Sequence, residues 1–250
     1  MLHLFLQGGY IMDNNTHNFQ NEDYYQDDSS GIITEVPFLA KSYLFLGLAM
    51  FVSGLVGIGL GKLTTYYPEI MMYAFYGGAI VVLITSFLIN INAYKRKSTT
   101  ATLVAFIIYS IAMGAMISPV FIVLSGDVLA ISFGITALVF GGLALYGHFS
   151  KRDFFGFGAF ITSLLFGGMI ISLLNFLIFR SFELNYIIEM VFFGVFLGYV
   201  IIDSNRIKRL QLAGETSSSL AIMCAMQLYS DFIYIFLRIA LIVLNSKSKK

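Results

Sequence analysis

Seven long apolar runs constrain this chain more than any other feature. They lie at 39–61, 69–91, 101–124, 128–148, 155–179, 184–204 and 218–244. A helix that crosses a bilayer needs about 20 mostly apolar residues, and each run has about that length. Only 12% of the residues are charged, against about 25% in soluble domains, so there are too few charges to cover a water-exposed surface. We therefore predict an all-α polytopic membrane protein whose seven transmembrane helices form one domain over 36–245.

Polar segments flank this domain. Residues 1–35 include an acidic stretch without apolar periodicity, which is typical of a disordered tail, and residues 246–250 form a short basic tail. The first eleven residues lack the basic flank of a signal peptide, so translation starts at either Met1 or Met12. The net charge of +1 gives no reason to expect a nucleic-acid partner, and a single cysteine excludes an internal disulfide.

Basic residues mark alternate connections between the runs. They are Lys95, Arg96 and Lys97 after the second run, Lys151 and Arg152 after the fourth, and Arg206, Lys208 and Arg209 after the sixth. The positive-inside rule places these connections, and hence the N-terminus, in the cytoplasm of a cell whose inner membrane holds the chain. Seven full spans put the lysines of the basic tail outside. Either the rule yields to the earlier loops, or the seventh segment does not cross fully.

Charged residues inside the runs are the candidates for function, because each costs about 2.5–3.5 kcal/mol at mid-bilayer. They are Glu189, Asp203, Asp231 and Arg238. Asp231 lies too deep in its run for a short carboxylate to reach water, so the seventh helix must face protein or a water-filled cavity. Arg238 follows two turns later on the same face, with Tyr234 between them. This polar stripe either lines a path or forms a buried structural contact. Glu189 and Asp203 lie nearer the helix ends, where solvated charges are common.

Several segments resemble, in order, the Bax inhibitor-1 family, also called the transmembrane Bax inhibitor motif family. The C-terminal signature is similar to LYSDFIYIFLRI (228–239), and Leu228, Tyr229, Asp231 and Phe236 match it. Other matching segments are VPFLAKSYLFLGLAM (36–50), MISPVF (116–121), SKRDFFGFGAF (150–160) and VIIDSNRI (200–207). The chain departs from the family pattern at Ile202, Ser204 and Asn205, and Arg238 comes earlier than the family's arginine.

The resemblance implies a seven-helix fold in which the seventh helix is central and wrapped by the others. It also implies a calcium-permeable leak controlled by pH through two aspartates, which by position are Asp203 and Asp231. Calcium is then the permeant ion, the two carboxylates are its ligands, and no cofactor is expected. Bacterial relatives can have an arginine in the second helix that pairs with the aspartates, but 69–91 contains no Lys or Arg. Candidates for pore lining or for such a latch are Arg238, Tyr234, Arg206 and Glu189.

The chemistry of two close carboxyl groups is compatible with this function. Both cannot ionise cheaply in a low dielectric, so the pair is expected to hold one proton near neutral pH and to titrate as a unit. The pair can share that proton as a lock, or lose it and attract a divalent cation. Calcium takes six to eight oxygens, whereas two carboxylates supply at most four, so the site would be weak and suited to passage.

Other function classes fit less well. An intramembrane aspartyl protease needs a Gly-x-Gly-Asp element, and the nearest string is LSGD (124–127). A retinal protein needs a lysine in the last helix, and 218–244 has none. We therefore expect no enzymatic activity. A proton-coupled calcium exchanger would use the same dyad. A non-transporting regulator of membrane protein quality control, with a membrane protease as partner, is a third reading that bacterial relatives suggest.

Single cysteines test the orientation. With Cys224 replaced by serine, we expect cysteines at Lys97 and at Asp127 to react with a membrane-impermeant reagent from opposite sides. The physical reason is that the connection at Lys97 is basic, whereas the one at Asp127 has no Lys or Arg. Labelling of intact cells and of inverted vesicles measures the difference. Equal labelling of both positions in intact cells would overturn the scheme.

Overall fold

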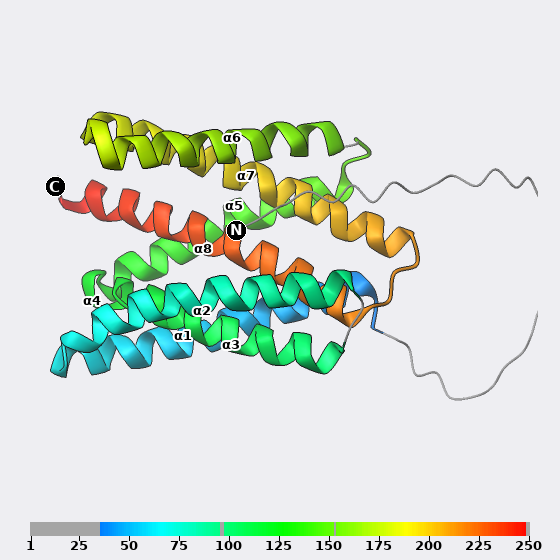
Figure 1. The fold of residues 1–250 in the computed structure, drawn as a ribbon, viewed down its shortest axis with the longest axis horizontal. Helices are drawn as coiled ribbons and strands as arrows, with labels where there is room; N and C mark the ends of the chain where they lie inside the picture. The colour runs from blue at the N-terminus through cyan, green and yellow to red at the C-terminus, as the bar shows by residue number, and fades with distance from the viewer. Residues whose placement is uncertain (1–35, 96–97, 153, 249–250) are drawn as a thin grey trace, which may run out of the picture.

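The apolar runs form helices that lie roughly along one axis (Figure 1). The computed structural model describes residues 36–95, 98–152 and 154–248, and this part holds seven segments long and apolar enough to cross a membrane. The elements are α1 (Phe38–Tyr66), α2 (Glu69–Tyr94), α3 (Thr99–Ile117), α4 (Val120–Val123), α5 (Gly126–Phe149), α6 (Phe155–Leu174), the π-helical turn η1 (Asn175–Phe179), α7 (Phe182–Leu212) and α8 (Ser218–Ser248). The predicted all-α fold with seven spans is confirmed. The predicted acidic tail, 1–35, lies outside the described residues.

Prolines set several helix boundaries. Pro37 and Pro68 come directly before α1 and α2, where the missing N–H of proline costs nothing. The third apolar run is interrupted at Pro119, so that α3 ends at Ile117 and the short α4 begins at Val120. Proline cannot donate the hydrogen bond that would continue the helix, which explains the break.

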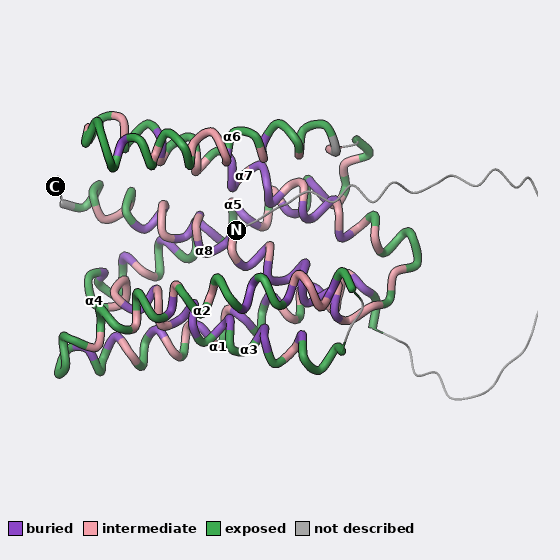
Figure 2. The backbone as a smooth tube through the Cα atoms, in the orientation of Figure 1, coloured by how far each residue is buried: buried purple, intermediate pink, exposed green. Residues whose placement is uncertain are grey.

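Helix α8 occupies the centre of the bundle, as the resemblance implied. In its most apolar stretch 72% of the residues are buried, against 17–44% in the other six spans. It packs against α1, α2, α3, α5 and α7, whereas α6 packs against α7. Figure 2 shows buried positions along most of α8 and exposed positions on α2 and α6. The helix that carries Asp231 is therefore surrounded by protein.

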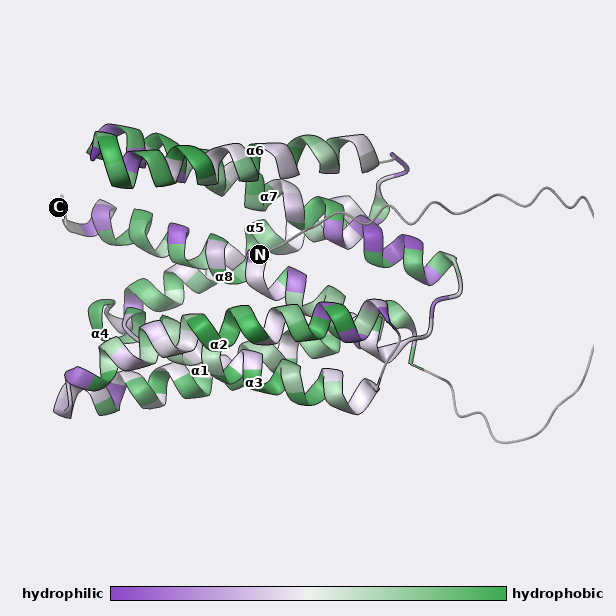
Figure 3. Cartoon of the chain, in the orientation of Figure 1, coloured by the Kyte–Doolittle hydropathy of each residue, from purple (hydrophilic) through white to green (hydrophobic). Residues whose placement is uncertain are grey.

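The outer surface of the bundle is apolar. Figure 3 shows hydrophobic colour along the outward helices and hydrophilic colour gathered near the end of α7. Large side chains such as Leu44, Phe51 and Leu138 are exposed on this surface. A water-soluble protein would not expose so much apolar area, whereas lipid tails solvate it without cost. The exterior therefore fits a bilayer.

The last two helices are longer than their apolar runs. Helix α7 continues to Leu212, beyond the apolar run that ends at 204, because hydropathy marks where apolar residues stop and this helix continues with polar ones. There, Lys208 donates a hydrogen bond to the carbonyl oxygen of Ser150 at 3.2 Å. Helix α8 runs the length of the bundle and ends at Ser248, within the segment predicted as the basic tail. The seventh segment therefore crosses the bundle fully.

A close approach of α5 to α7 fixes the position of α7. A Cβ atom added at Gly147 would overlap the carbonyl oxygen of Ile201. The Asn205 side chain donates a hydrogen bond to the Gly147 carbonyl oxygen at 3.0 Å across the same contact. Asp203 lies between these two α7 residues in sequence, so this contact holds the backbone on both sides of it.

A single methyl group tests this contact. We expect Gly147→Ala to lower the free energy of unfolding by about 1–3 kcal/mol, because the added carbon forces α5 away from α7. Gly142→Ala, on the same helix, is the matched control, since a Cβ there meets nothing within 4 Å. It should be neutral or gain up to about 1 kcal/mol of helix propensity. Thermal unfolding in detergent measures both, and equal stabilities would contradict the packing argument.

Candidate functional site

The seam between α7 and α8 holds the two aspartates. The helices are antiparallel and joined by 213–217, so the end of α7 meets the start of α8. By helical rise, Asp203 lies about 14 Å from the Leu212 end, and Asp231 about 20 Å from the Ser218 end. The two carboxyl groups therefore lie at similar depth and are close enough to interact electrostatically. The extension of α7 past its apolar run is what makes this possible.

Both carboxyl groups are in the protein interior. Asp203 is 3% exposed and Asp231 5%. Oxygen Oδ2 of Asp231 is buried without a hydrogen-bond partner among the described residues. An unsatisfied buried oxygen costs about 1–3 kcal/mol, more if charged, so this geometry favours a neutral carboxyl group over an isolated carboxylate. Whether the pair acts as the pH sensor stays a prediction.

Tyrosine side chains surround the dyad. Tyr109 of α3 is fully buried, and its hydroxyl lies 2.7 Å from the Ser230 hydroxyl, beside Asp231. Tyr109 interacts electrostatically with Asp231, and Tyr199 of α7 interacts with both aspartates. Sequence reasoning missed Tyr109 and Tyr199. A tyrosine within an apolar run was the available signal, but many tyrosines occur in these runs, and neither Tyr109 nor Tyr199 has charged residues within four positions on both sides, as Tyr234 has.

Arg206 places a positive charge one turn after Asp203. The sequence put this residue in a loop, but it lies within α7 and interacts electrostatically with Asp203. Its guanidinium group donates to the Tyr94 hydroxyl at 3.2 Å and to Oε1 of Gln227 at 3.4 Å. Helix α2 contains no Lys or Arg that could pair with the aspartates. It contributes the hydroxyl of its last residue, Tyr94, which accepts the hydrogen bond from Arg206. The arginine beside the dyad thus comes from α7 itself.

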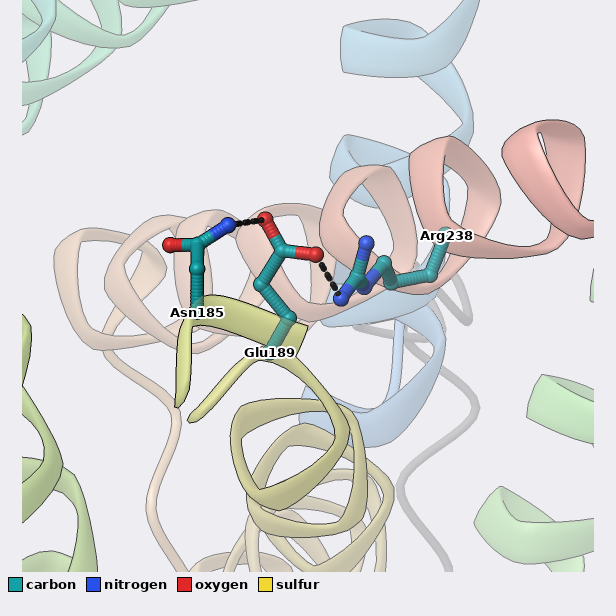
Figure 4. A network of polar contacts seen from close by, with 3 residues as sticks. All are labelled: Asn185, Glu189 and Arg238. Atoms are coloured by element: carbon teal, nitrogen blue, oxygen red, sulfur yellow. Dashed lines mark hydrogen bonds and ion pairs between the residues drawn. The ribbon is translucent and has the colours of Figure 1, made fainter. Parts of the chain in front are cut away.

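A second polar cluster lies further along the same seam, towards the start of α7 and the end of α8. Arg238 of α8 forms an ion pair with Glu189 of α7 at 2.5 Å, and Asn185 donates to the other Glu189 oxygen at 2.9 Å (Figure 4). The Arg238 side chain is 15% exposed and that of Glu189 39%. Arg238 shares a helix face with Asp231, but its partner is Glu189. The sequence analysis named Glu189, Asp231 and Arg238 as candidates but did not predict that Arg238 pairs with Glu189.

An aromatic stack separates the two clusters. The rings of Phe196 and Tyr234 lie 4.0 Å apart and 21° from parallel, between the dyad and the Glu189–Arg238 pair along the seam. Tyr234 also interacts with both members of that pair. The two rings are thus in contact across the seam, with the two aspartates on one side of them and Glu189 on the other.

The ligand set at the dyad is small. Among residues 36–95, 98–152 and 154–248, no cluster of three or more His, Cys, Asp or Glu side chains forms a metal site. The two aspartates alone supply carboxylate oxygens there, which is fewer than calcium takes. A cation at this position would complete its shell with water or neutral oxygens.

Comparisons with known proteins give consistent relatives. Residues 36–249 match the sequence profile of the family described as inhibitor of apoptosis-promoting Bax1. The inner membrane protein YbhL of Escherichia coli K12 is 31% identical over 175 residues, which are 68% of this chain and 74% of the relative. An uncharacterized protein of Borreliella burgdorferi is 28% identical over 211 residues, 82% and 90% of the two chains. An uncharacterized membrane protein of Streptococcus pyogenes serotype M1 is 30% identical over 217 residues, 80% and 89%. No solved structure matches the chain.

A double-mutant cycle tests the Glu189–Arg238 pair. We expect Arg238→Gln to lower the free energy of unfolding by about 1–3 kcal/mol, because it leaves a carboxylate without its partner inside the bundle. Glu189→Gln should cost more, since it leaves the more buried guanidinium of Arg238 without its partner. The double variant should cost less than the sum, with a coupling of about 1 kcal/mol.

The exposed pair of Asp127 and Lys247 is the control. Water screens that pair, so the coupling in the cycle of Asp127→Asn and Lys247→Gln should be near zero. Thermal unfolding in detergent measures both cycles. Additive effects at Glu189 and Arg238 would show that the contact contributes nothing to stability.

Proposed function

The chain belongs to the Bax inhibitor-1 family, and we propose from this premise that it is a pH-sensitive calcium leak channel. The observation that carries the proposal is the pair of buried, interacting carboxyl groups of Asp203 and Asp231 on adjacent central helices. Acidic side chains inside a membrane are costly and typically mark ion or proton pathways. The Escherichia coli relative is an inner membrane protein, and we propose the same location for this chain, with its N-terminus in the cytoplasm.

The dyad acts as a proton-controlled lock. In the shut state the two carboxyl groups share a proton, which holds α7 against α8 and removes one negative charge. Loss of the proton leaves two negative charges that repel each other and attract a divalent cation. Arg206 holds its positive charge beside Asp203 throughout and so lowers the electrostatic cost of the charged state. Flux should therefore rise as pH rises.

The aromatic stack fits a shut conformation. An ion that leaves the dyad towards Glu189 along the seam would pass the stacked rings of Phe196 and Tyr234. Separation of α7 from α8 at the dyad would also separate these rings, because each helix carries one of them. The Glu189 carboxylate beyond the stack offers the ion its next oxygen ligands.

Two other functions use the same features. A proton-coupled calcium exchanger would bind its proton and its ion at the same dyad, but its transport would depend on a pH gradient. A regulator of membrane protein quality control would act through a membrane protease and move no ion. Calcium uptake into proteoliposomes separates the regulator from the other two, and the dependence of uptake on membrane potential then separates leak from exchange.

Charge-neutral variants test the dyad directly. We expect calcium flux in wild-type proteoliposomes to rise with pH across neutrality, because the shared proton is lost. Asp231→Asn should abolish this pH dependence, since an amide does not titrate. Asp203→Asn should do nearly the same, because the proton belongs to the pair. Flux measured at a fixed calcium gradient over a series of pH values gives the comparison.

Asp127→Asn serves as the control, because it removes a carboxylate that lies at the end of the bundle and pairs with Lys247. It should keep the full pH response. If either dyad variant also keeps that response, the two aspartates are not the sensor. If wild-type protein moves no calcium at any pH, the leak proposal fails as a whole.

A further inference from the structure

An open groove runs along the outside of the bundle, and neither aspartate of the dyad lines it. Its volume is about 840 Å³, within the ~300–1,000 Å³ range of small-ligand sites. Its walls come from α1, from the segment around α4 and from α5, and its floor is Phe232, Ile233 and Phe236 of the central helix α8. It reaches from Met50, near the middle of α1, to Lys62 near the end of that helix.

The surroundings of the groove decide what fills it. Most of its lining is apolar, and lining residues such as Ile58, Ile122 and Phe133 are exposed on the outer surface of a chain that spans the membrane. Water would gain few hydrogen bonds there, whereas a hydrocarbon chain would cover the apolar walls without cost. The groove therefore fits one acyl chain from the bilayer.

One end of the groove carries an unpaired cation. The Lys62 ammonium group makes no hydrogen bond or ion pair with the described residues, and its side chain is exposed. The exposed Tyr66 and Tyr67 follow it, as is typical of the interface where lipid headgroups lie. The carboxylate of Asp127, at the start of α5, is bonded to Lys247 and Ser125, so it has its own partners and does not need Lys62.

We propose that this groove binds an anionic phospholipid, with one acyl chain against α8 and the phosphate on Lys62. The length of the groove supports this, because it joins an apolar interior to a cation at the headgroup level within one continuous space. The lipid would contact Phe232 and Ile233, the two residues that follow Asp231. It would thus add to the packing that α1 and α5 already provide around this part of the central helix. The proposal does not depend on calcium transport.

The chain has no tryptophan, so a single added indole reports on the groove without background. We would place one at Phe133, which lines the groove, and measure quenching of its fluorescence in bilayers that contain brominated phosphatidylglycerol or brominated phosphatidylcholine. We expect about fivefold stronger relative association with phosphatidylglycerol, the preference that one lysine near an anionic headgroup gives. Leu138→Trp, on the lipid-facing side of the same helix, should show no preference.

Two further changes, each made in the Phe133→Trp protein, separate the parts of the proposal. Lys62→Gln should remove the preference for phosphatidylglycerol, whereas Lys95→Gln, at the other end of the bundle, should keep it. Gly54→Leu should lower quenching by both lipids, because Gly54 lines the groove and a Cβ there meets nothing within 4 Å. Gly59→Leu, with the same free space but outside the lining, is its control.

Each outcome decides the matter. Equal quenching by the two lipids, or a preference that survives Lys62→Gln, would overturn the role of Lys62. Quenching unchanged by Gly54→Leu would place the lipid outside the groove. An indole at 133 that emits as in water and is not quenched would show a hydrated groove and would overturn the proposal entirely.

Discussion

A helix that carries Asp231 and Arg238 cannot face hydrocarbon, because each charge costs about 2.5–3.5 kcal/mol at mid-bilayer. The rest of the bundle follows from this constraint. Five spans pack directly around α8, and the stretch that holds both charges is the most buried in the chain. The other helices need only one polar or small face and leave their large apolar side chains to the lipid. Helix α8 is thus central because its charged side chains must be kept away from the lipid.

The α7–α8 seam concentrates the charged groups that this requirement allows. On one side of the Phe196–Tyr234 stack lie two acidic groups with Arg206 beside them, and on the other side lies the Glu189–Arg238 pair. The first cluster has more acid than base and is suited to change its proton or ion content. The second is balanced in charge and is suited to hold the helices together. In the proposed function, switching therefore belongs to the first half of the seam and anchoring to the second.

The sequence predicted the parts of this arrangement that depend on local composition. The length and apolarity of the runs were enough to predict seven spans. The missing N–H of Pro119 predicted the break in the third run, and the depth of Asp231 in its run predicted a buried seventh helix. The end of α7 was not predictable from hydropathy, because polar residues continue the same helix beyond the apolar run. The partner of Arg238 was not predictable either. It depends on the rotation of α7 about its own axis, which close packing such as that of Gly147 against Ile201 determines.

The position of the charged helix after the six other described spans has a consequence for biogenesis. Helix α8 leaves the ribosome after the other six described spans, which by then can be in the membrane. It is also the span that the translocon would insert least readily by itself, because lipid would then solvate both Asp231 and Arg238. When synthesis follows this order, the polar and small side chains of the earlier spans are in place before Asp231 and Arg238 enter the membrane. An order of synthesis that began with α8 would leave it to wait in the lipid, as a substrate for membrane quality control.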